Sequence, residues 1–298
     1  MIKNTYIYPK ISNKPKVRMR DLSIKNIKKR KAYEQAFKRV IDHGQFILGK
    51  EVKNFEKNIC KIIKSKYTIG VSSASSGLLL ALKAANISSG DEIITTPMSW
   101  LVSSSVIKMV GAKAKFVDVD EDCNIDPNLI LKKINFKTRA VIVVHFYGKI
   151  AQIEKIRKIC KKNKLILIED CAQAFGAKIK NGYAGSFGDF GIFSFGPMKV
   201  HGGIGDAGAI VCKNRNYYKK LISLRQCGTI KNEIAIYPEI KHTLDALHAA
   251  ILNENLKIFK KTRANRIKIA KQYISHLKKY YKCPSYNSYD HTFMISLS

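Results

Sequence analysis

The sequence predicts an α/β fold in which a mostly parallel central sheet is covered by helices on both faces. From Tyr67 onward, short runs of β-branched residues alternate with helical patterns, an order that is typical of β-α-β units. The strand-length runs are apolar throughout, which indicates strands buried on both faces. Ligands bind such sheets at the carboxyl ends of the strands, so we expect functional residues there.

Each element is predicted by its own stretch of sequence. Apolar runs bounded by turn residues predict strands at 68–72, 92–96, 115–119, 140–145 and 165–169. The stretches between them predict helices at 77–85, 101–110, 127–133 and 152–162. Beyond Asp170 the pattern changes to two antiparallel-looking strands that flank a glycine-rich turn, at 190–195, 208–212 and 202–205 respectively.

The length of 298 residues fits one large domain with a smaller appendage. We expect an extended N-terminal arm, a large domain and the start of a small C-terminal α+β domain, at 1–22, 23–235 and 236–298. In the last of these, residues 243–281 predict two helices with a break near 260–264, and residues 291–298 have the pattern of a strand.

Composition excludes some classes of function. No apolar run approaches the roughly 20 residues that a membrane-spanning helix needs, so no membrane segment is predicted. The formal net charge is +32, but the excess is mostly lysine spread along nearly every predicted helix. Nucleic-acid surfaces instead cluster arginines with interleaved aromatics. We interpret the charge as solvated lysine faces, whose field would still attract a small substrate that carries a diphosphate.

The seven cysteines show no C-x-x-C spacing, and an odd number cannot all pair within the chain. This pattern favours a reducing, cytoplasmic compartment and predicts no metal site. The basic N-terminus lacks the apolar region of a secretory signal, so none is predicted.

Three predicted strand ends carry polar or aromatic groups. The first strand runs into S-S-A-S-S-G (72–77), whose small residues would let backbone N–H groups approach an anion, although on this stretch alone an ordinary serine cap is the favoured explanation. Trp100, the single tryptophan, follows the second strand; alone, such a residue is more often core than cofactor platform. Asp170 ends the strand L-I-L-I-E-D, where a carboxylate must be paired with a cation or a donor.

A lysine completes this set. Lys199 follows the aromatic, glycine and proline run F-S-F-G-P-M (193–198), which a helix interior would not tolerate. An anion cradle, an aromatic plate, a buried acid and a lysine are together what pyridoxal phosphate requires. The lysine forms the Schiff base, and the acid keeps the ring nitrogen protonated. Partial burial would lower the pKa of the lysine and make it nucleophilic.

The chain resembles the sugar aminotransferases of the DegT/DnrJ/EryC1/StrS family, from about His43 to its C-terminus. The matching motifs, in chain order, are G-Q-F-I-L-G-K-E-V-K-N-F-E (44–56), S-A-S-S-G-L (73–78), H-F-Y-G (145–148), E-D-C-A-Q-A-F-G-A (169–177), G-S-F-G-D-F-G-I-F-S-F-G-P-M-K (185–199) and G-D-A-G-A-I-V (205–211). One such motif would be weak evidence, whereas several in the right order are specific.

The resemblance implies a fold type I pyridoxal-phosphate transferase. The implied reaction moves an amino group, from glutamate, to a keto sugar carried on a nucleoside diphosphate, for amino-sugar or surface polysaccharide biosynthesis, in a homodimer. The implied catalytic residues are Lys199, for the Schiff base and proton transfer, and Asp170, on the pyridinium nitrogen. Further implied cofactor contacts are Gln173 near the phenolic oxygen, Trp100 against the ring, and Ala74, Ser75 and Ser194 on the phosphate.

The sequence departs from the family pattern at several positions. Phe175 and Cys227 each replace a histidine. Lys241 stands where the family sends an asparagine across the dimer to the phosphate, and could serve as a charged substitute; Thr243 stands in place of an arginine. The chain also stops at the first strand of the expected small domain, whereas family members continue.

Three alternatives therefore stay open. One is a truncated homologue that binds the cofactor without catalysis. Another is a related sugar dehydratase, in which a histidine replaces the lysine, so that Lys199 argues against it although His201 lies two residues on. The third, which the sequence favours least, is a basic nucleic-acid-binding protein, in which Lys199 would have no special role.

Overall fold

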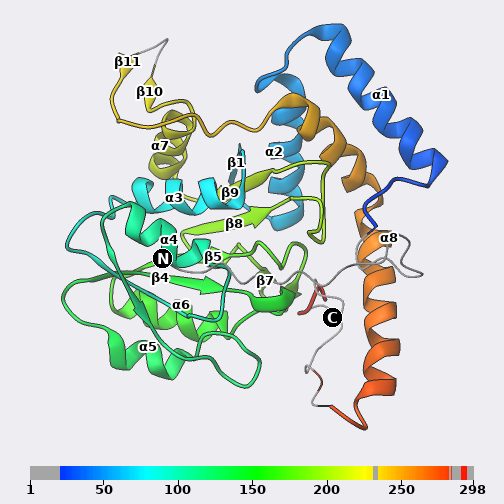
Figure 1. The fold of residues 1–298 in the computed structure, drawn as a ribbon. Helices are drawn as coiled ribbons and strands as arrows, with labels where there is room; N and C mark the ends of the chain where they lie inside the picture. The colour runs from blue at the N-terminus through cyan, green and yellow to red at the C-terminus, as the bar shows by residue number, and fades with distance from the viewer. Residues whose placement is uncertain (1–20, 231–233, 282, 284–289, 294–298) are drawn as a thin grey trace, which may run out of the picture.

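The computed structural model of this chain describes residues 21–230, 234–281, 283 and 290–293. At its centre is a seven-stranded sheet with the order β1-β9-β8-β5-β4-β2-β3 (Figure 1). Its strands are β1 (Tyr67–Val71), β2 (Glu92–Thr95), β3 (Lys113–Phe116), β4 (Thr138–Val144), β5 (Ile166–Asp170), β8 (Phe190–Ser194) and β9 (Gly208–Cys212). Two short ribbons pair β6 (Lys178–Ile179) with β7 (Gly182–Tyr183), and β10 (Thr229–Ile230) with β11 (Ile234–Ala235).

The sheet is mostly parallel, as predicted. Only β9 runs against its neighbours, β1 and β8. The predicted antiparallel pair around the glycine-rich turn is therefore confirmed. Among the strands of this sheet, β3 departs most from its predicted bounds, because it begins at Lys113, which pairs with Glu92 at the start of β2.

Helices cover both faces of the sheet. They are α1 (Ile27–His43), α2 (Gly49–Ile63), α3 (Ala74–Ala84), α4 (Val102–Met109), α5 (Pro127–Lys133), α6 (Ile153–Lys162), α7 (Arg215–Arg225) and α8 (Ala246–Leu277), with a 3-10 turn η1 at Phe146–Gly148. Successive side chains of β4 enter two different cores. Val141 and Val143 pack with α2, α5, α6 and α8, whereas Ala140 and Ile142 pack with α3, α4 and α7. This alternation explains why the strand is apolar throughout.

The prediction of two helices between 243 and 281 is wrong, because α8 is one helix of 32 residues. The stretch K-K-T-R-A at 260–264 contains neither glycine nor proline, so nothing in it breaks a helix. The hydroxyl of Thr262 donates to the carbonyl of Ile258 one turn earlier, at 3.2 Å, a bond that lies within the helix and does not interrupt it. The first half of α8 packs on α1 and α2, and the second half extends away from them (Figure 1).

The two ends of the chain are described only in part. Residues 1–20 of the predicted arm and 294–298 of the predicted last strand lie outside the described residues. Within that predicted strand, His291 forms an antiparallel bridge with Lys149. The domain boundary at 236 stays a prediction. Among the described helices, none has both the length and the apolar character that crossing a membrane demands.

Candidate active site

The polar strand ends come together at the carboxyl edge of the sheet, where the sequence places the site. Asp170 ends β5, which pairs with β8, and Ser194 ends β8. The helices α3 and α4 begin just beyond the ends of β1 and β2, which run in the same direction as β5 and β8.

Asp170 is a buried carboxylate with few partners. Ser103 Oγ, on α4, donates to its Oδ2 at 3.1 Å, and the N–H of Ala172 donates to its Oδ1 at 3.0 Å. Burial raises the pKa of Asp170, and these donors together with the charge of Lys199 oppose the rise. Among the described residues only these two hydrogen bonds reach the carboxylate. A protonated ring nitrogen would supply the missing cation, so the residue fits pyridoxal phosphate.

Lys199 lies in the loop after β8, where its N–H donates to the carbonyl of Gly196 at 2.9 Å. Partial burial lowers its pKa, and the charge of Asp170 opposes that shift. Burial therefore favours the neutral amine, which is the nucleophilic form. The predicted pair of lysine and acid thus comes together, each within the electrostatic influence of the other.

An anion cradle forms at the N-terminus of α3. Ser73 caps this helix by accepting from the N–H of Ser76 at 3.1 Å, which leaves the N–H groups of Ala74 and Ser75 without an acceptor among the described residues. Ser194 pairs with Gly208, and a Cβ on Gly208 would lie 2.7 Å from the backbone nitrogen of Ala74. This close approach brings the Ser194 backbone beside the cradle. Free donors at a helix N-terminus fit a phosphate group.

Gln173, Trp100 and Lys241 were predicted as further cofactor contacts. The side-chain oxygen of Gln173 accepts from the N–H of Tyr147 at 2.6 Å. Trp100 is 76% exposed, just before α4. Lys241 is also exposed, and its neighbour His242 accepts from the N–H of Ser72, so this segment runs beside the cradle. The contacts of all three with a cofactor stay predictions.

Ser103 was not predicted from the sequence. It lies three residues after Trp100, and its N–H donates to the carbonyl of Trp100 at 3.0 Å in the first turn of the helix. A polar residue one turn into a helix that starts at a strand end is a weak signal for such a contact. The hydrogen bond to Asp170 depends on how the start of α4 is placed at the edge of the sheet, which a single sequence does not display.

Glu169, behind Asp170, is fully buried and was treated from sequence only as part of a motif. It accepts from three backbone N–H groups of the 185–188 loop and lies 2.9 Å from His145 Nε2. Because Ala151 donates to Nδ1 of this histidine, Nε2 carries the proton and donates to Glu169. The thiol of Cys171 also bonds to the Glu169 backbone. These groups are close enough to surround an ion, but their atoms are already engaged in fixing the strand end.

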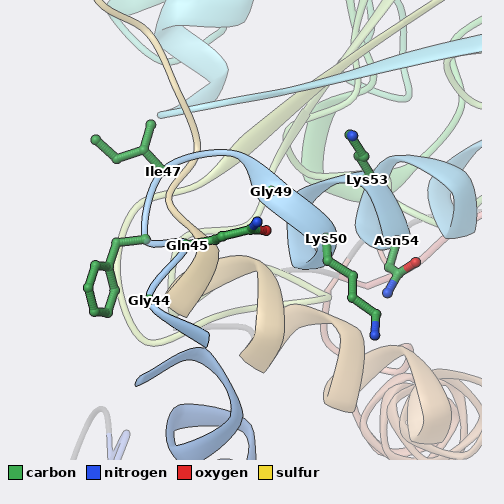
Figure 2. Close-up of a pocket in the computed structure, with 8 residues that line it drawn as sticks. Gly44, Gln45, Ile47, Gly49, Lys50, Lys53 and Asn54 are labelled. Atoms are coloured by element: carbon green, nitrogen blue, oxygen red, sulfur yellow. The ribbon is translucent and has the colours of Figure 1, made fainter. Parts of the chain in front are cut away.

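A separate open hollow of about 830 Å³ lies beside the segment that precedes α2 (Figure 2). It is lined by Gln45, Lys50 and Lys53 among others, and by no predicted site residue. The carbonyl of Phe46 in this segment accepts from the N–H of Ala246 at 2.8 Å. The hollow therefore borders the start of α8.

The fold, with its buried acid, lysine and anion cradle at one edge of the sheet, defines a pyridoxal-phosphate enzyme of fold type I. The family model for the DegT/DnrJ/EryC1/StrS aminotransferase family matches residues 27–294, and the chain belongs to this family. The resemblance of its motifs is thereby confirmed.

Several known proteins are similar over most of the chain. The dTDP-3-amino-3,6-dideoxy-alpha-D-galactopyranose transaminase of Aneurinibacillus thermoaerophilus is 38% identical over 87% of this chain and 71% of its own length. The UDP-2-acetamido-2-deoxy-3-oxo-D-glucuronate aminotransferase of Pseudomonas aeruginosa is 32% identical, over 82% and 68% respectively. The structure of NtdA from Bacillus subtilis, with the bound cofactor PMP, matches with a TM-score of 0.84 and 28% identity, over 90% of this chain and 63% of that one.

Proposed function

We propose that this chain transfers an amino group from glutamate to a keto sugar carried on a nucleoside diphosphate, in amino-sugar or surface polysaccharide biosynthesis. The observation that carries the proposal is the pair of Lys199, which is half-buried, and Asp170, which is buried, at the end of the sheet beside an anion cradle. Burial of a charged group costs free energy, and neither group has an evident structural role that would offset this cost.

Each residue of the site has a task in this proposal. Pyridoxal phosphate, when bound, supplies an electron sink and a carrier for the amino group. Asp170 would hold a proton on the ring nitrogen, and Ser103, which donates to its Oδ2, would orient its carboxylate. Lys199 would supply the amine that bonds to the cofactor and would move protons during the reaction, since partial burial lowers its pKa and favours the nucleophilic neutral form. The free N–H groups at the start of α3 would hold the phosphate.

The substrate class is supported by the relatives and by charge. Two similar proteins are named for amino transfer to sugars on different nucleotides, dTDP and UDP. The net charge of +32 attracts a substrate that carries a diphosphate. We infer that the nucleoside diphosphate gives the anchoring charge and that the ketone of the sugar receives the amine.

The test is the absorbance spectrum of the purified protein with pyridoxal phosphate, before and after glutamate is added. We expect a visible absorbance band. Glutamate should remove this band by converting the cofactor to its amine form, and a nucleoside diphosphate keto sugar should restore it. Lys199→Ala should abolish the band, whereas Lys180→Ala, at an exposed lysine, should keep it. Folded protein without a band would contradict the proposal and favour a non-catalytic homologue. A deoxygenated sugar product would favour the dehydratase.

We also infer that the protein is a homodimer in the cytoplasm. Apolar side chains stand exposed on the segments that follow the strand ends and beside the cradle: Trp100 at 76%, Leu101 at 75%, Met198 at 50% and Ile240 at 69%. Apolar groups gathered in this way favour cover by a second copy. All seven cysteines are free thiols, which supports a reducing compartment.

A further inference from the structure

The turn that begins at His145, next to the candidate site, has an unusual backbone. Tyr147 has a φ of +52° and Gly148 a φ of +92°. A left-handed conformation is costly for tyrosine and persists only where the surroundings impose it. Two side chains impose it here: Asn124 accepts from the N–H of Phe146 at 3.0 Å, and Gln173 accepts from the N–H of Tyr147 at 2.6 Å.

Thr292, near the end of the chain, closes this arrangement. It is fully buried, and its N–H donates to the carbonyl of Gly148 at 2.9 Å. Its hydroxyl donates to the backbone carbonyl of Gln173, also at 2.9 Å. The packing is tight, because a Cβ on Gly148 would lie 2.1 Å from the threonine hydroxyl. Thr292 therefore holds both the 145–148 turn and Gln173, whose side chain supports that turn.

These contacts determine which way the Gln173 amide faces. A backbone N–H needs an acceptor, so the atom that meets Tyr147 is the oxygen Oε1. The nitrogen Nε2 then points elsewhere, and no acceptor for it is found in the described part of the chain. Gln173 lies three residues beyond Asp170, so this donor stands in the turn that follows β5, the strand that ends with the acid of the site.

We propose that Thr292 is a positioning residue of the cofactor site, which fixes Gln173 and the 145–148 turn so that the Gln173 amide nitrogen meets the cofactor. The inference rests on the proposed function, because it assigns Gln173 to the cofactor. It also gives the segment at 290–293 a role in the site, although it is distant in sequence from every other site residue.

A purely structural role for the hydroxyl is the competing explanation. The segment is also held by contacts that do not involve the hydroxyl: His291 bridges Lys149, and Arg266 Nη2 on α8 donates to the carbonyl of Phe293 at 2.8 Å. Thr292→Val keeps the β-branched shape and these contacts, and removes only the hydroxyl. The variant therefore separates positioning of Gln173 from docking of the segment.

The experiment compares Thr292→Val, Thr292→Ser and Gln173→Leu in the cofactor-loaded protein. The readouts are the affinity for pyridoxal phosphate and the pH midpoint at which the visible band of the bound cofactor changes. We expect Thr292→Val to weaken the affinity about threefold to tenfold, as for the loss of one hydrogen bond. It should move the midpoint in the same direction as Gln173→Leu, and Thr292→Ser should restore wild-type values. The matched control is Thr262→Val, which loses an exposed hydroxyl that bonds only within α8.

The double variant decides whether the effect passes through Gln173. If it does, Thr292→Val combined with Gln173→Leu should give the midpoint of Gln173→Leu alone. Additive shifts, or wild-type values in folded Thr292→Val, would overturn the proposal. If Thr292→Val does not fold, Thr292→Cys, which has a weaker donor, is interpreted in the same way. A wild-type protein without any visible band would instead contradict the proposed function, before a variant is compared.

Discussion

The hydroxyl of Ser103 on α4 lies 3.1 Å from the buried carboxylate of Asp170 at the end of β5. Donation to a carboxylate stabilises its charged form, and this hydrogen bond opposes the rise in the pKa of Asp170 that burial causes. It joins two elements that approach each other only in the folded chain.

Replacement of Ser103 by alanine should weaken cofactor binding. The pKa of Asp170 would rise further, so less of the acid would be charged to pair with the ring nitrogen. We expect about a tenfold loss of affinity for pyridoxal phosphate, measured by absorbance titration. The control is Ser104→Ala, since Ser104 is the next residue of α4 but bonds only the carbonyl of Leu101. Equal affinities of the two variants would show that the Ser103 bond is unimportant.

The pKa of Lys199 should depend on Asp170. The negative charge raises this pKa against the lowering by burial, so Asp170→Asn should lower it further. In the cofactor-free protein, the pH midpoint for modification of Lys199 by an amine-reactive reagent should then move to lower pH, as followed by peptide mass spectrometry. Asp42→Asn, on an exposed part of α1, should leave the midpoint unchanged. A shift to higher pH in Asp170→Asn would contradict the assigned interaction.

Gly208 sets the shape of the anion cradle. A Cβ there would lie 2.4 Å from the Ser73 carbonyl carbon and 2.7 Å from the Ala74 nitrogen, both of which are backbone atoms. We expect Gly208→Ala to displace the start of α3, to lower Tm by about 5 °C and to weaken binding of pyridoxal phosphate more than that of pyridoxal. In Gly203→Ala the nearest contact of the new Cβ is the end of the Leu252 side chain at 3.3 Å. The preference for pyridoxal phosphate over pyridoxal should therefore persist in this variant. Loss of the preference for pyridoxal phosphate over pyridoxal in both variants would contradict the assignment of the cradle to the phosphate.

His201 should make the protein sensitive to acid. It is buried among aromatic rings, its Nε2 has no partner among the described residues, and burial lowers its pKa to about 3. The unfolded chain titrates at an ordinary histidine pKa, so between that value and about 3 only the unfolded state takes up the proton. Stability therefore falls as the pH falls through this window.

The measurement is the decrease in the urea concentration at the midpoint of unfolding when the pH is lowered from about 7 to about 4.5. The urea midpoint of His201→Leu should decrease less than that of the wild type over this range. His276→Leu, at an exposed position near the end of α8, should behave as the wild type does. If His201→Leu and the wild type lose equally, protonation of His201 does not contribute to acid unfolding.

The proposed homodimer should be sensitive to charge at Leu101. This residue is 75% exposed next to Trp100, and a glutamate there would have to be buried between two copies. We expect Leu101→Glu to sediment as a monomer where the wild type sediments as a dimer. Met109→Glu alters a residue of α4 that is 68% exposed but lies at the far end of the helix, and it should stay dimeric. A monomeric wild type would contradict the homodimer itself.

Much of the fold could be predicted because its signals are local. The strands β1, β2, β5, β8 and β9 were predicted to within one residue at each end, since each is an apolar run between turn residues. Asp170 at the end of a strand followed from the same pattern, and Lys199 from the glycine-rich turn beyond β8. The charge of each residue acts on the pKa of the other, and their roles in the site stay predictions.

The features that were missed depend on tertiary contacts. Ser103 acquires its role because the start of α4 reaches Asp170 at the end of β5, and Thr292 because a segment 119 residues beyond Gln173 returns to it. The false break in α8 has a different cause. Lysines and other polar residues at 260–264 hide the pattern of a helix whose second half is largely exposed, whereas backbone continuity requires only the absence of a breaker.

The continuity of α8 sets the rotational phase of its side chains. His248 and Arg266 are 18 residues apart, which is five full turns, so they project from the same side of the helix about 27 Å apart. His248 abuts Gly205 in the turn that follows Lys199, and Arg266 holds the carbonyl of Phe293 beside Thr292. A one-residue insertion between them would rotate Arg266 by about 100°. The unbroken helix thus keeps the lysine loop and the final segment in register.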